Sequence, residues 1–79
     1  MSSKLVSLNE IPVGTSAKVS SIYPESKVRR RLMDMGIVKG TDILVEGKAP
    51  MGDPIEINLR GYKLTLRKSE AKDVMMELV

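Results

Sequence analysis

The stretch Lys27 to Gly40, KVRRRLMDMGIVKG, decides the fold, because an amphipathic helix stops there at a glycine and gives way to strands. Val28, Leu32 and Met35 recur at helical spacing and form one apolar stripe, while most positions between them are charged. Gly36 follows the stripe and can adopt the left-handed conformation that ends a helix. We therefore expect the helix to end at about Met35, with Gly36 at positive φ.

The start of this helix is marked by two residues upstream of the stripe. Pro24 is tolerated in a first helical turn, where its missing N–H would be unpaired anyway. Glu25 places negative charge near the positive end of the helix dipole. Together they predict that the helix starts between Tyr23 and Ser26.

The segments on either side of the helix have the alternation of apolar and polar residues that is typical of half-buried strands. Upstream, Leu5, Leu8 and Ile11 form an apolar lead-in, followed by a turn at residues 12–15. Downstream, Arg60 and Gly61 alone separate two alternating runs, which predicts a tight antiparallel hairpin. We expect five strands, at about Ser16–Ile22, Asp42–Lys48, Ile55–Leu59, Tyr62–Arg67 and Val74–Leu78.

Two breaks interrupt this strand pattern. Residues 49–54, with two prolines and a glycine, can continue neither a helix nor a strand. Ser69 can cap a single helical turn before the last strand. The short strands and hairpin-sized loops favour a mainly β fold with one helix, a small five-stranded SH3-like barrel with the helix inserted after the first strand, over an OB-fold. We expect residues 1–79 to form a single domain.

Composition narrows the class of protein. The chain has no Cys, so neither a disulfide nor a thiolate metal site is available, and no apolar run approaches the length of a membrane span. The N-terminus also lacks the apolar region of a signal peptide, so we expect a cytoplasmic protein. The formal net charge is +3, and residues 1–40 carry 7 Lys+Arg against 3 Asp+Glu. The basic helix predicts contact with an acidic protein, nucleic acid or an anionic membrane surface, unless it is only a solvated face.

The available side chains argue against several activities. With no His or Cys and no nucleophile-elbow serine, catalysis would rest on carboxylates, Lys or Tyr, so we expect no enzyme and no cofactor. Two Tyr and no Phe or Trp leave few stacking platforms for single-stranded nucleic acid, so we expect no specific nucleic-acid binding. Asp53 and Glu56, or Glu46, could offer oxygen to a metal ion, but so few ligands would bind weakly, and we expect no metal site.

Four sequence blocks follow one another along the chain: Arg31-Leu32-x-x-Met35-Gly36-Ile37-x-x-Gly40, Ala49-Pro50-x-Gly52-Asp53-Pro54, Leu64-x-Leu66-Arg67 and Ala71-x-x-Val74. In this order and spacing they resemble the FeoA family, the small cytosolic component of bacterial ferrous iron uptake. The resemblance spans roughly residues 5 to 78 and implies an SH3-like barrel. It also implies an accessory role for the membrane permease FeoB, whose cytosolic GTP-binding domain is a plausible docking site, and the alternative is a metal-responsive domain that itself binds a transition metal ion.

The residues that we expect to contact such a partner fall into two groups. Arg29, Arg30 and Arg31 lie on the charged side of the helix, where an acidic surface would match them. Met51 in the proline-rich loop and Met75, out of phase with its apolar neighbours in the last strand, are candidates for exposed apolar contact, as is Met33 off the helix stripe. The alternative for the methionines is that they fill gaps in a thin core.

Overall fold

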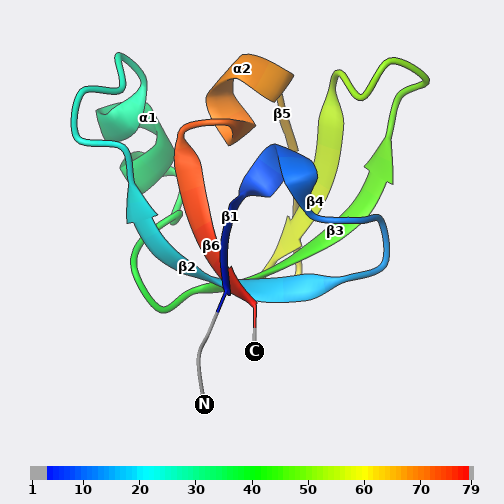
Figure 1. Cartoon of the computed structure of the whole chain (residues 1–79), viewed down its shortest axis with the longest axis horizontal. Helices are drawn as coiled ribbons and strands as arrows, with labels where there is room; N and C mark the ends of the chain where they lie inside the picture. The colour runs from blue at the N-terminus through cyan, green and yellow to red at the C-terminus, as the bar shows by residue number, and fades with distance from the viewer. Residues whose placement is uncertain (1–3, 79) are drawn as a thin grey trace.

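The computed structural model describes residues 4–78, which form one curved antiparallel sheet and three short helical segments. The strands are β1 (Lys4–Ser7), β2 (Ser16–Ile22), β3 (Asp42–Lys48), β4 (Ile55–Leu59), β5 (Tyr62–Leu66) and β6 (Val74–Leu78). The helical segments are the 3₁₀ turn η1 (Leu8–Glu10) and the helices α1 (Arg29–Asp34) and α2 (Lys68–Ala71). In Figure 1, α2 lies between α1 and the β3–β4 loop at one end of the molecule.

The sheet has six strands, in the order β1-β6-β2-β3-β4-β5, so the expectation of five strands was wrong by one. The additional strand is β1, in the segment that we interpreted as an apolar lead-in. It pairs with β6 from Lys4 opposite Leu78 to Ser7 opposite Met75. Across residues 4–78, β1 and β5 are the two outer strands and do not pair, so the small SH3-like barrel that we expected is not closed.

Two bulges bend the long strands of this sheet. The register shifts between Val19 and Ser21 where β2 meets β6, and between Val45 and Gly47 where β3 meets β4. A bulge adds one residue on one side of a ladder and turns the strand sharply, which lets a single sheet curl around a core. The buried apolar residues come from β2 to β6, both α-helices, the loop after α1 and the lead-in: Leu8, Ile11, Ala17, Val19, Ile22, Leu32, Ile37, Ile43, Val45, Ile55, Ile57, Leu59, Leu66, Ala71, Val74 and Met76.

Helix α1 ends as the sequence predicted. Met35 is its C-cap, Gly36 has φ of +97°, and the Ile37 N–H donates to the Leu32 carbonyl at 3.1 Å. The Gly36 N–H donates to the Met33 carbonyl at 3.0 Å. These two bonds satisfy carbonyls of the last helical turn in the arrangement known as a Schellman motif.

The predicted start of α1 was wrong. The helix begins at Arg29 rather than between Tyr23 and Ser26, so Pro24 and Glu25 lie in a preceding turn. A tertiary contact holds that turn: the Ser26 hydroxyl donates to Asp73 Oδ2 at 2.6 Å, just before β6. Because the partner of Ser26 lies 47 positions away in the sequence, the residues near the helix do not indicate where it starts.

The β4–β5 hairpin and the helical turn α2 are both present. Arg60 and Gly61 have φ of +52° and +87°, as the two central residues of a type I′ turn require, and Leu59 lies opposite Tyr62. The predicted capping residue of α2 was wrong: Ser69 lies inside the helix, and Arg67 is its N-cap. The Glu70 carboxylate reaches back and accepts the Arg67 N–H at 2.9 Å.

Candidate docking surface around helix α1

The charged face of α1 divides into two kinds of arginine. Arg29 and Arg30 are exposed and make no ion pair among the described residues. Arg31 is also exposed, at 62% of its side chain, but its guanidinium donates to the nearly buried carboxylate of Glu70 on α2. Arg31 thus ties α1 to α2, whereas Arg29 and Arg30 keep their charge available to a partner.

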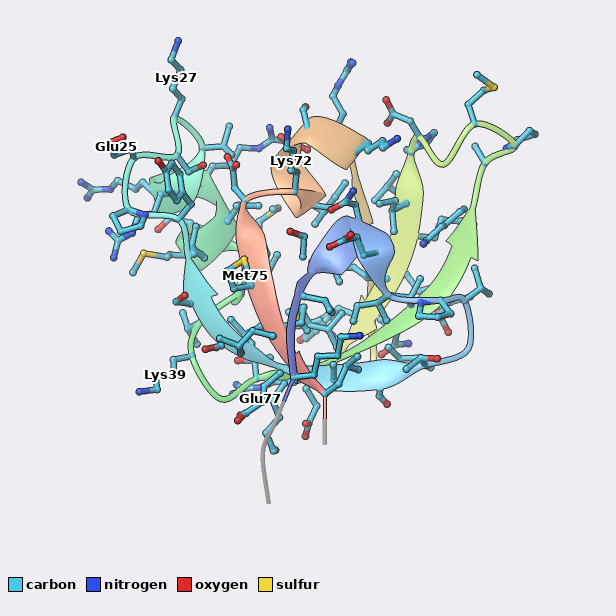
Figure 2. All side chains as sticks on the ribbon, viewed as in Figure 1. Glu25, Lys27, Lys39, Lys72, Met75 and Glu77 are labelled. Carbon is cyan, nitrogen blue, oxygen red and sulfur yellow. The ribbon has the colours of Figure 1, made fainter. Side chains whose placement is uncertain are left out.

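The candidate methionines do not gather on one surface. Met51 is 84% exposed in the β3–β4 loop, which α2 separates from α1 in Figure 1. Met75 lies on β6 between β1 and β2, half-buried, with its sulfur 4.0 Å from the Ser7 hydroxyl (Figure 2). Met33 is 41% exposed on α1. Of the three, Met33 alone lies on the same helix as the arginines.

Met33 lines a groove between α1 and β2 that the sequence did not indicate. The groove encloses about 340 Å³ and is mainly apolar along its floor, where Met33 and Val38 are the exposed apolar side chains. Arg29 and Lys39 stand at its edge, and Figure 2 shows Lys39 projecting from the loop after α1. The full lining is Ser20, Ser21, Ile22, Pro24, Arg29, Met33, Ile37, Val38 and Lys39.

This combination is suited to protein contact. An apolar floor can take one buried side chain, while charges at the edge act mainly on partner choice and association rate. The signal in the sequence was the apolar pair Ile37-Val38 directly after the helix cap. In the structure Ile37 is buried and Val38 is 39% exposed.

The oxygen ligands considered for a metal ion do not form a cluster of three, and one of them is already engaged. Asp53 Oδ1 accepts the Lys68 N–H at 3.0 Å at the start of α2, which is a capping contact. Glu46 and Glu56 are exposed strand residues. Within residues 4–78, no three carboxylates approach one another closely enough to hold a metal ion.

Fold and surface together define a class: a small, mainly β domain of six strands with short helices, which presents a cationic helix beside an apolar groove. Over residues 4–78 it has no helix long and apolar enough to cross a membrane. Residues 6–78 match the family model described as FeoA domain. The chain therefore belongs to the FeoA family, as the sequence blocks predicted.

Solved structures of similar proteins support the fold. A FeoA-like protein from Clostridium acetobutylicum is 59% identical, covers all of this chain and 91% of its own, and superposes with a TM-score of 0.89. The FeoA of Stenotrophomonas maltophilia, solved with zinc and described as an SH3 domain protein, is 35% identical with a TM-score of 0.78. The match covers 90% of this chain and 88% of that one. The SH3-like fold expected from the sequence is consistent with these structures.

A curated relative links the family to ferrous iron transport. In Porphyromonas gingivalis, an Fe(2+) transport protein A/Fe(2+) transporter FeoB fusion protein is 31% identical over 72 residues. The match covers 91% of this chain but only 8% of the relative, so this chain corresponds to a small part of that polypeptide.

Proposed function

We propose that this protein is a non-enzymatic, cytoplasmic accessory component of bacterial ferrous iron uptake, a single domain over residues 1–79 that acts by contact with a FeoB-type transporter. The observation that carries the proposal is the Porphyromonas gingivalis relative, in which a FeoA and a FeoB are one polypeptide. Fusion keeps two modules at high effective concentration, which is useful when the modules act on one another.

The docking surface in this proposal is the exposed face of α1 with its groove. Arg29 and Arg30 attract an acidic patch on the transporter's cytosolic GTP-binding domain, because neither forms an ion pair within residues 4–78. An apolar side chain of the partner then fills the groove between Met33 and Val38. Arg31 supports the surface by holding α1 against α2 through Glu70.

The two remaining candidate methionines have different places in this proposal. Met51, which is 84% exposed, serves as a second apolar contact, separate from the α1 face. Met75 is half-buried and positions β1 against β6 through Ser7 in addition to any partner contact.

The direct test is co-purification of the chain with the transporter's cytosolic domain, with and without guanine nucleotide. We expect the double variant Arg29→Glu, Arg30→Glu to lose most of the captured partner while keeping the parent's circular dichroism. A charge-matched control replaces two exposed lysines away from α1, Lys4→Glu with Lys72→Glu, and should retain capture. Equal loss in both variants would mean that only net charge matters, which contradicts a docking surface on α1.

The alternative role, a metal-responsive domain that itself binds a transition metal ion, has less support in this chain. Zinc accompanies the Stenotrophomonas maltophilia protein, but within residues 4–78 of this chain Asp53 is used as a cap and no three carboxylates come together. The proposal therefore assigns no metal ion and no cofactor to this protein.

A further inference from the structure

Strand β5 is an outer strand whose far side is free of backbone partners. It pairs with β4 alone among the described strands, and the two-residue turn makes Leu59 and Tyr62 a hydrogen-bonded pair. Alternate residues therefore bond to β4, and the N–H and C=O groups of Lys63 and Thr65 point away from the sheet. Neither residue has another backbone partner within residues 4–78, and both side chains are exposed.

This free edge opens onto a groove shared with both helices. The groove measures about 440 Å³ and is lined by Thr65, Leu66 and Arg67 at the end of β5, by Arg31 of α1 and by Glu70 of α2. Asp53 and Pro54 complete the lining. The Arg31 side chain of α1 and the α2 residue Glu70 thus lie beside the Thr65 end of the free edge, and the groove leaves space for a chain there.

The charged side chains of β5 and of the residues beside it in sequence are positive, although the exposed Glu56 of β4 lies opposite Thr65. Residues 60–69, RGYKLTLRKS, carry four cations and no carboxylate. The two carboxylates that line the groove are already engaged: Glu70 accepts from Arg31 and from the Arg67 N–H, and Asp53 accepts the Lys68 N–H. A second copy of β5 would place its own cations beside the cations of this strand, so repulsion between like charges disfavours self-pairing at this edge.

We infer that β5 accepts an extended acidic segment of a partner protein as a seventh, antiparallel strand. Its main chain bonds to the outward groups of Lys63 and Thr65, as in known cases of strand addition. Side chains on the exposed face of the added strand lie beside Lys63, so carboxylates suit those positions. Side chains on the other face lie beside the half-buried Leu64, so apolar residues suit these.

This inference concerns a surface distinct from the Arg29–Arg30 face. It does not depend on the transporter being the partner, because the recognition comes from backbone geometry and local charge. A nucleic acid could satisfy the charge but not the alternating backbone bonds. The test must therefore separate the two contributions.

The probe is a blocked ten-residue peptide that alternates Glu and Val, added to the isotopically labelled full chain. We expect the amide protons of Lys63 and Thr65 to slow in hydrogen exchange and their resonances to shift. N-methylation of the Glu amides, which face β5 in the antiparallel register, should weaken binding about tenfold or more. N-methylation of the Val amides, which face away, should leave the affinity nearly unchanged and serves as the matched control.

Variants of the protein give the complementary test. Thr65→Pro removes one outward N–H without touching the pairing with β4, and should weaken peptide binding, whereas Thr65→Val should not. If Thr65→Pro fails to fold, the methylated peptides still decide. The inference is overturned if millimolar peptide protects neither amide, if both methylated peptides bind equally, if the shifts fall on α1 instead, or if a ten-residue oligothymidylate binds as well as the peptide.

Discussion

Replacement of Gly36 by valine tests whether a single backbone conformation sets the end of α1. Gly36 has φ of +97°, a region that costs an L-residue roughly 1–2 kcal/mol and a β-branched residue more. A Cβ at this position would also lie 3.3 Å from Leu59 Cδ2, closer than ordinary packing. We expect Gly36→Val to lower the free energy of unfolding by roughly 2–3 kcal/mol.

The assay is thermal and urea denaturation followed by circular dichroism. For a domain of this size, the expected loss corresponds to a drop in Tm of roughly 10–20 °C, with the slope of the urea transition unchanged. Gly36→Asn should cost less than Gly36→Val, because asparagine tolerates positive φ.

Gly40→Val is the matched control for packing, since Gly40 has φ of +87° but no atom within 4 Å of an added Cβ. The difference between the two valine variants therefore reports the contact with Leu59. If Gly36→Val melts with the parent, the glycine cap does not stabilise the helix end, and the reasoning that placed it there is refuted.

Three further outcomes are expected. Glu70→Ala should destabilise the fold by roughly 1–3 kcal/mol, because it removes the acceptor for Arg31 and for the N–H of Arg67, the N-cap of α2. A loss no larger than that of Glu25→Ala, at an exposed position, would contradict this. Anaerobic calorimetric titration with Fe²⁺ should show no binding tighter than about 10 μM. A stoichiometric sub-micromolar isotherm that disappears in Asp53→Asn with Glu56→Gln would instead support the metal-binding alternative. Association with the transporter's cytosolic domain, followed by stopped flow, should slow as salt is raised, and the arginine pair of α1 should account for most of that dependence. A rate indifferent to salt would move the docking surface to the apolar contact at Met51.

Several elements of the fold were predictable because their signals are local. The strands at Ser16–Ile22 and Asp42–Lys48 have the bounds that alternation and turn residues predicted. The hairpin at Arg60-Gly61 and the cap at Gly36 followed from backbone conformations that few residues adopt. The FeoA sequence blocks also carried the family assignment, since their order and spacing span most of the chain.

The candidate site was only partly predictable. The exposed arginines follow from their positions off the apolar stripe, which a helical period is enough to identify. That Arg31 is engaged by Glu70, 39 positions away, follows from the packing of α1 beside α2. The groove beside Met33 likewise forms where β2 and the loop after α1 come together. A periodic pattern in the sequence does not indicate how close these two segments lie.

What the sequence by itself determined is therefore the set of elements whose cause lies within a few residues: alternating strands, tight turns and a glycine that ends a helix. Tertiary structure determined the conformation of the segments whose own local preference is weak, because strand pairing and packing outweigh that preference there. Strand β1 has no alternation of its own and forms because β6, some 70 residues away, offers an edge to it. Helix α1 starts late because Asp73 holds Ser26, and the sheet stays open because its outer strands β1 and β5 do not pair within residues 4–78. Such contacts join distant segments, so their energies are available only once the chain has folded.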